Sequence, residues 1–119
     1  MKEQASIAEI KKEELVDLVN SLSFEDQEKI TFNGSRYLLW LFTEEDMNTG
    51  DEHEKVFYSA STADRGCWDI YMLENLSDAE KKRSMFHEIL ECNLKDRGFD
   101  ESLTHELALK AEEEVFGQR

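Results

Sequence analysis

The apolar residues in the first part of the chain recur every three or four positions, as they do along one face of a helix. They run from Ile7 to Leu22. The segment SIAE at residues 6–9 has the Ser-x-x-Glu spacing of a capping box, in which two side chains satisfy backbone amides at a helix start. This pattern predicts a first helix over Ile7–Ser21.

Between residues 29 and 73 the pattern changes to short apolar runs that are typical of strands. Asn33-Gly34 separates the first two runs, and this pair favours a tight hairpin because both turn residues tolerate positive φ. The second run is apolar at every position from Tyr37 to Phe42, which indicates a central strand covered on both faces. The predicted strands are Lys29–Phe32, Ser35–Phe42, Lys55–Ala60 and Cys67–Leu73.

Two further helices are predicted after the strands. A second capping box, SDAE at residues 77–80, begins a helix that runs to Arg97, and Gly98 suits the turn out of it. Asp100 can cap the last helix, Glu101–Phe116. Because helices and strands are segregated along the chain, we expect an α+β fold in a single domain over residues 1–119. Pairing the strands in chain order gives a four-stranded antiparallel meander with one N-terminal helix and two C-terminal helices.

Acidic residues outnumber basic residues by 28 to 14, and the net charge is −14. This balance argues against binding to nucleic acid or to an anionic membrane surface, since both need Lys and Arg contacts. It favours cations or basic proteins as partners, and an acidic DNA-mimic inhibitor of a basic protein is one function of this kind. Solubility alone also explains such a charge, and the sequence identifies no protein partner.

Cys67 and Cys92 are the only cysteines, and they form no CxxC pair of the kind that holds zinc. The first residues, MKEQASIAEIKKEE, contain no apolar run, and no segment reaches transmembrane length. We therefore expect a cytoplasmic protein without membrane association, whose thiols are reduced and pack as small hydrophobic groups. Trp40 and Trp68 lie in predicted strands and are expected in the core.

The most acidic segment of the chain, residues 44–54, connects the second and third predicted strands and contains no Lys or Arg. Close carboxylates repel one another, and a bound divalent cation replaces this repulsion with attraction. Ca²⁺ suits the segment because it takes roughly six to eight oxygen ligands and tolerates irregular geometry. Gly50 lets the backbone turn sharply so that several oxygens can converge. The predicted Ca²⁺ ligands are Glu44, Glu45, Asp46, Asn48, Asp51, Glu52 and Glu54.

This segment begins like the loop of an EF-hand but departs from that pattern. Gly50 falls one position early, and Phe57 stands where the EF-hand has its bidentate Glu. The leading prediction is therefore a calcium-binding protein without an EF-hand, an intracellular buffer or sensor and not an enzyme. A solvated polar loop without an ion is the alternative. The run Glu112–Glu114 fits either a second, weaker cation site or a solvated helix face.

In its size, its acidity and its carboxylate-rich loop, the chain resembles the small, acidic, non-EF-hand calcium-binding proteins of heterocyst-forming cyanobacteria. The resemblance implies a cyanobacterial protein that sequesters intracellular calcium and takes part in calcium signalling during cell differentiation.

The segment MFHEILE at residues 85–91 resembles the active-site helix of the zincin metallopeptidases. In that family an HExxH motif places two zinc-binding His residues one turn apart and supplies Glu as a general base. Glu91 stands in place of the second His, so the resemblance implies at most a degenerate zincin-like site of His87, Glu91 and His105. On a helical wheel His87 and Glu91 fall at the edge of the apolar face and Glu88 points to solvent, which also fits a purely structural helix.

Overall fold

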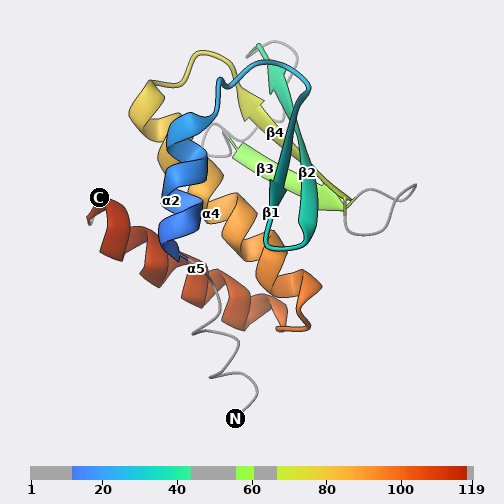
Figure 1. Ribbon diagram of the computed structural model, residues 1–119, viewed down its shortest axis with the longest axis vertical. Helices are drawn as coiled ribbons and strands as arrows, with labels where there is room; N and C mark the ends of the chain where they lie inside the picture. The colour runs from blue at the N-terminus through green and yellow to red at the C-terminus, as the bar shows by residue number, and fades with distance from the viewer. Residues whose placement is uncertain (1–11, 44–55, 61–66, 118–119) are drawn as a thin grey trace.

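The structure is a computed structural model that describes residues 12–43, 56–60 and 67–117 (Figure 1). Within these ranges the chain forms three helices, α2 (Lys12–Ser21), α4 (Asp78–Asp96) and α5 (Glu101–Phe116). The strands between α2 and α4 are β1 (Glu28–Phe32), β2 (Ser35–Phe42), β3 (Val56–Ala60) and β4 (Cys67–Leu73). The predicted element order and the α+β class agree with this arrangement, and the part of the first predicted helix before Lys12 lies outside the described residues.

The four strands form one mixed sheet in the order β1-β2-β4-β3, so the predicted antiparallel meander is wrong. β1 and β2 form the expected antiparallel hairpin. β4 lies beside β2 and pairs with it in parallel along the whole of Cys67–Leu73. β3 pairs antiparallel with β4 and takes the edge of the sheet.

The strand directions are those of a meander, and only the positions of β3 and β4 are exchanged. A tight turn fixes the pairing of β1 with β2, whereas the connection from β2 to β3 over residues 43–55 is long enough to reach past a neighbouring strand. β4 carries the longer apolar run, CWDIYML, and gains more by lying in the centre of the sheet. The shorter β3 takes the edge, where short strands limit unwanted pairing with other chains.

The β1–β2 hairpin turn is held against α4 by a buried amide. Asn33 and Gly34 have φ values of 50° and 87°, which confirms the turn with positive φ at both central residues. Asn93 on α4 is 1% exposed, and its Nδ2 donates to the Ser35 hydroxyl at 3.1 Å. The Asn33 side chain in turn donates to Oδ1 of Asn93 at 2.9 Å. These bonds fix the position of α4 along the sheet.

The ends of α4 and α5 are set by the residues that the sequence indicates. The Ser77 side chain accepts the amide of Glu80 at 3.2 Å and begins α4. Gly98, with φ of 96°, turns the chain after α4. The Asp100 carboxylate then accepts the amide of Leu103 at 2.8 Å and begins α5. The two helices are therefore joined by a short turn and lie next to each other.

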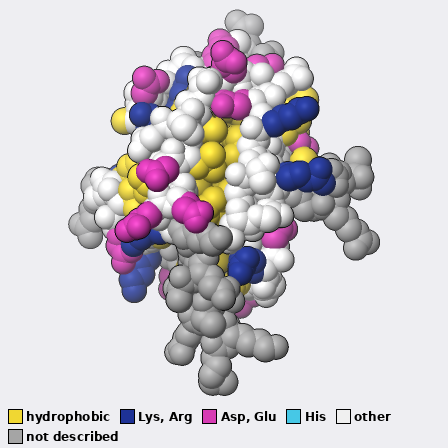
Figure 2. Space-filling view, in the orientation of Figure 1, with side chains coloured by type: hydrophobic (Ala, Val, Ile, Leu, Met, Phe, Trp, Pro, Cys, Tyr) yellow, Lys and Arg dark blue, Asp and Glu magenta, His cyan; other side chains and the backbone are white. Residues whose placement is uncertain are grey.

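The core lies between the sheet and α4, which has α2 and α5 packed against it (Figure 1). Side chains alternate along β2: Tyr37 and Leu39 are buried toward the helices, and Arg36 is exposed. Figure 2 shows a central band of hydrophobic side chains between α2 and the β1–β2 hairpin, and smaller patches at the edges of the same face. α4 packs against the sheet through an apolar face that includes Phe86, Ile89 and other fully buried residues.

The two tryptophans occupy different environments. Trp68 is half-buried, packs against the core and donates from Nε1 to Asp96 at 2.9 Å. Trp40 is also half-buried, but it is outside the core cluster, so the expected core position is wrong for this residue. Its ring stacks on Tyr71 with centroids 6.4 Å apart, and its Nε1 donates to Asp69 at 3.2 Å.

Candidate metal centre

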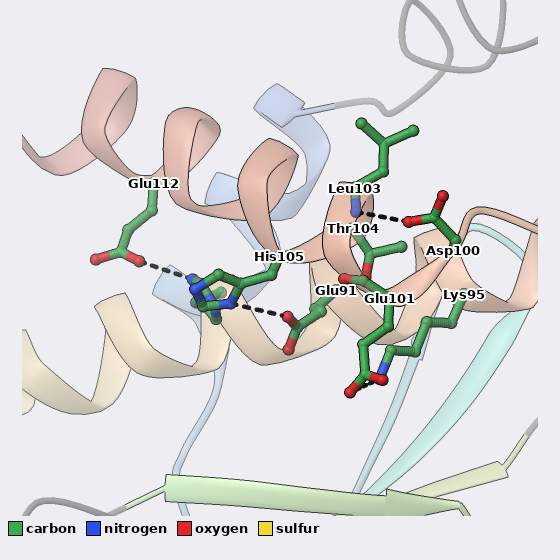
Figure 3. Close-up of polar contacts among 9 residues, drawn as sticks. Glu91, Lys95, Asp100, Glu101, Leu103, Thr104, His105 and Glu112 are labelled. Atoms are coloured by element: carbon green, nitrogen blue, oxygen red, sulfur yellow. Dashed lines mark hydrogen bonds and ion pairs between the residues drawn. The ribbon is translucent and has the colours of Figure 1, made fainter.

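A group of potential metal ligands lies between α4 and α5. It consists of His87 and Glu91 on α4 and His105 on α5, and one ligand atom from each lies within 4.8 Å of the others. His87 and Glu91 are four positions apart, so they share one side of the helix. Figure 3 shows that Glu91 and Glu112 approach the two sides of the space around His105 from different helices.

The register of the two helices follows from which residues meet. Glu91 contacts His105, whereas His87, one turn earlier on α4, contacts Glu112, which lies two turns later on α5. The helices therefore run antiparallel, as the short turn at Gly98 requires. This register brings a histidine of each helix to the same level, with ring centroids 5.3 Å apart and an interplanar angle of 71°.

Glu91 and His105 form the half of the group that is closer to solvent. A hydrogen bond joins Nδ1 of His105 to Oε2 of Glu91 at 3.1 Å. The side chain of His105 is 62% exposed, whereas that of Glu91 is 8% exposed. The group is thus accessible from the His105 side, and the buried Glu91 carboxylate has a polar partner there.

Glu112 and Arg83 support the other half of the group. Oε1 of Glu112 lies 2.9 Å from Nδ1 of His87, and Oε2 accepts a hydrogen bond from Nε of Arg83. The Glu112 side chain is only 3% exposed and that of Arg83 14%, so this is a largely buried ion pair. Burial alone would raise the pKa of Glu112, but the hydrogen bond from Arg83 and the neighbouring His87 outweigh burial and lower that pKa.

Two imidazoles and one carboxylate suit Zn²⁺ and other first-row transition ions. In a tetrahedral complex with bonds of about 2.1 Å, neighbouring ligand atoms lie about 3.4 Å apart. The three ligand atoms, within 4.8 Å of one another, would have to move together by up to about 1.4 Å. The exposed ring of His105 has room to turn, and its hydrogen bond to Glu91 would open as the ion enters. Three protein ligands leave one position for water, as in zinc sites that are not fully closed.

The resemblance to the zincin helix predicts correctly that His87, Glu91 and His105 lie close together, but the predicted solvent exposure of Glu88 is wrong. Glu88 is half-buried rather than solvent-exposed, and its Oε1 atom is buried. The charge of Glu88 raises the pKa of the Cys92 thiol one turn further along, after burial as the main cause. Among the described residues, the ligand group consists of His87, Glu91 and His105 and does not include Glu88.

The run Glu112–Glu114 is not a uniform solvated face. Glu113 and Glu114 are exposed, and Glu114 accepts a hydrogen bond from Nζ of Lys12 at 2.6 Å. Glu112 is buried, so a solvated face is the wrong interpretation for this residue. A signal was present in the sequence, because Glu112 continues a stripe of every fourth residue, Thr104 and Ala108, that forms the buried side of α5.

The seven predicted Ca²⁺ ligands, from Glu44 to Glu54, lie outside the described residues, and the calcium site stays a prediction. The described part of the chain shows how acidic and basic side chains are distributed on one face of the molecule. On the face in Figure 2, several carboxylate side chains gather at the lower left and others lie near the top, and Lys and Arg side chains lie at the right and left of the same face. None of the described helices combines the length and the apolar character that a membrane span needs.

Comparison of the chain with models of known families, with curated proteins and with solved structures finds no match. The resemblances to the cyanobacterial calcium-binding proteins and to zincins therefore stay predictions.

Proposed function

We propose that the chain is a metal-binding protein that holds Zn²⁺, or a transition ion of similar preference, through His87, Glu91 and His105. The observation that carries the proposal is the convergence of these three ligands from two helices within 4.8 Å. Two imidazoles favour such an ion over Ca²⁺, which prefers oxygen ligands throughout. The proposal is binding and not peptide hydrolysis, because Glu88 is not part of the ligand group and the zincin mechanism needs that carboxylate at the metal.

The charge of the group also favours a cation. Glu91 and Glu112 are both buried carboxylates; Arg83 and His87 contact Glu112, and His105 contacts Glu91. A divalent ion at the group adds positive charge where burial makes it most effective. Because the ion needs unprotonated imidazole nitrogens, its affinity should fall as the pH is lowered.

Calorimetric titration of chelator-treated protein with Zn²⁺ tests the proposal. We expect one ion per chain, and we expect His87→Ala and His105→Ala each to weaken binding at least about tenfold, which is about 1.4 kcal/mol. The remaining histidine of the chain supplies a matched control, because His53→Ala should leave the affinity unchanged. Absence of stoichiometric binding, or equal affinity in the His87→Ala variant, would refute the site.

A second candidate function is Ca²⁺ binding by residues 44–54, and the observation that favours it is their density of carboxylates without a basic residue. We expect Ca²⁺ to raise the melting temperature, and Asp46→Asn with Asp51→Asn to weaken Ca²⁺ binding at least about tenfold. His87→Ala should leave Ca²⁺ binding unchanged, which separates this function from the first. No change in melting temperature in millimolar Ca²⁺ would end this proposal.

A further inference from the structure

Glu112 contacts His87, a member of the ligand group, and its other contacts bear on how His87 is oriented. Glu112 is buried on α5, and each of its carboxylate oxygens contacts a different side chain. Arg83 donates to Oε2, and Nδ1 of His87 lies 2.9 Å from Oε1. A guanidinium carries only donors, and a carboxylate paired with it acts as an acceptor. The contact between His87 and Glu112 is therefore a bond in which Nδ1–H of His87 donates.

This bond decides which nitrogen of His87 is available to an ion. A neutral imidazole carries its hydrogen on one nitrogen and its lone pair on the other. With the hydrogen on Nδ1, the lone pair of His87 is on Nε2. Metal-binding histidines usually donate their other N–H to a carboxylate or carbonyl, which fixes the ring orientation and raises the basicity of the ligand.

We infer that Glu112, held in place by Arg83, is a positioning residue for the metal centre: it fixes the Nδ1–H tautomer of His87 and directs Nε2 to the ion. The inference rests on the proposed function, since it assigns the support of the same site. Arg83 is itself positioned, because its guanidinium carbon lies 6.0 Å from the centre of the Phe116 ring. Phe116 packs edge-on against the buried Phe86, with ring centroids 5.5 Å apart.

The two histidines of the group differ in this respect. Nδ1 of His105 is bonded to Glu91, which is itself a proposed ligand, so this contact must rearrange when the ion binds. His87 keeps its bond to Glu112 while Nε2 binds, since Glu112 is not a ligand. His87 is thus already oriented for metal binding, whereas the His105 side chain must rotate before it can bind the ion.

The variant Glu112→Gln tests the inference with little change in shape. Its amide has a single oxygen, and Arg83 requires an acceptor, so the NH₂ group should face Nδ1 of His87 and favour the opposite tautomer. We expect ¹⁵N spectra of the metal-free protein at pH 8 to show Nδ1–H at His87 in the wild type and a shift toward Nε2–H in Glu112→Gln. Zn²⁺ affinity should fall by about 10-fold to 100-fold. Glu113→Gln, a change of the exposed neighbour, is the matched control and should alter neither quantity.

The outcomes separate the inference from the proposed function. Wild-type protein that binds Zn²⁺ while Glu112→Gln binds it equally well, or a wild-type His87 that carries its hydrogen on Nε2, would overturn the role of Glu112 and leave the site standing. Wild-type protein that does not bind Zn²⁺ would overturn the site and, with it, the role of Glu112 in metal binding. The ¹⁵N measurement of the His87 tautomer uses only wild-type protein, so it tests the inference even if Glu112→Gln fails to fold.

Discussion

The buried pair of Arg83 and Glu112 makes a specific prediction about stability. Arg83→Met removes the guanidinium but keeps most of the aliphatic stem, so that packing against the neighbouring Phe116 ring is largely retained. The Glu112 carboxylate, 3% exposed, then loses its guanidinium partner and keeps the contact with His87. Removal of one member of a buried ion pair typically costs about 3–5 kcal/mol, because the remaining charge stays buried and is poorly compensated.

The lower end of this range applies, since Arg83 is 14% exposed and water can reach part of the pair. We expect Arg83→Met to lower the free energy of unfolding by about 3 kcal/mol at pH 7.5. For 119 residues the entropy of unfolding is about 0.25 kcal/mol/K, so the melting temperature should fall by about 12 °C.

Urea denaturation of the wild type, Arg83→Met, Glu112→Gln and the double variant measures this prediction. The double variant removes the buried charge together with its partner, so it should be more stable than Arg83→Met alone. A loss below about 1 kcal/mol in Arg83→Met would show that the carboxylate is compensated in another way. A double variant whose loss equals the sum of the two single losses would show that the residues do not interact.

Three further predictions concern Glu112 and two other buried groups. Stability should decrease as the pH falls below the ordinary Glu pKa of about 4.5, because the pKa of Glu112 is lowered by folding, and Glu112→Gln should flatten this dependence in acid denaturation curves. Burial raises the pKa of the Cys92 thiol, so iodoacetamide at pH 8 should leave Cys92 unmodified in native protein and modify it in urea. Mass spectrometry measures the modification of each cysteine. Modification of Cys92 as fast as that of Cys67 in native protein would contradict the burial of Cys92. Asn93→Leu should destabilise the protein by about 2 kcal/mol in urea titrations, because the Ser35 hydroxyl and other buried polar groups lose a partner; a loss within error would refute the role assigned to this amide.

The local features of the fold were predictable because each depends on a few neighbouring residues. Asn33-Gly34 requires a backbone with positive φ, and the two capping residues of α4 and α5 satisfy amides within their own first turn. The central position of β2 followed from its uninterrupted apolar run. None of these depends on which distant segments meet.

The strand order was not predictable in the same way. The exchange of β3 and β4 depends on how much apolar surface each would bury beside β2, and the sequence between β2 and β3 does not restrict that choice. The docking of the hairpin on α4 through Asn93 is a contact between residues about 60 positions apart, for which no local pattern exists. Such contacts are decided by the packing of the whole domain.

The three residues of the ligand group were candidates from the sequence, but the residues that surround them were not predicted. The spacing of His87 and Glu91 places both on one side of a helix, and His105 was a candidate by residue type alone. The burial of Glu112 and its contact with His87 were not predicted, because a run of three Glu residues fits a solvated face or a cation site equally well. The distinction between Glu112 and its neighbours requires the register of α5 against α4, and the buried stripe of α5 sets that register.

X-ray absorption spectroscopy of the Zn²⁺-loaded protein tests the central claim most directly, because it reports the atoms bound to the ion. The proposed site predicts a shell with two imidazole nitrogens at about 2.0–2.1 Å and carboxylate or water oxygens at about 2.0–2.2 Å. The His105→Ala variant should lose one imidazole from this shell, and His53→Ala should lose none. A shell of oxygen atoms alone, or one that His87→Ala and His105→Ala leave unchanged, would contradict the account.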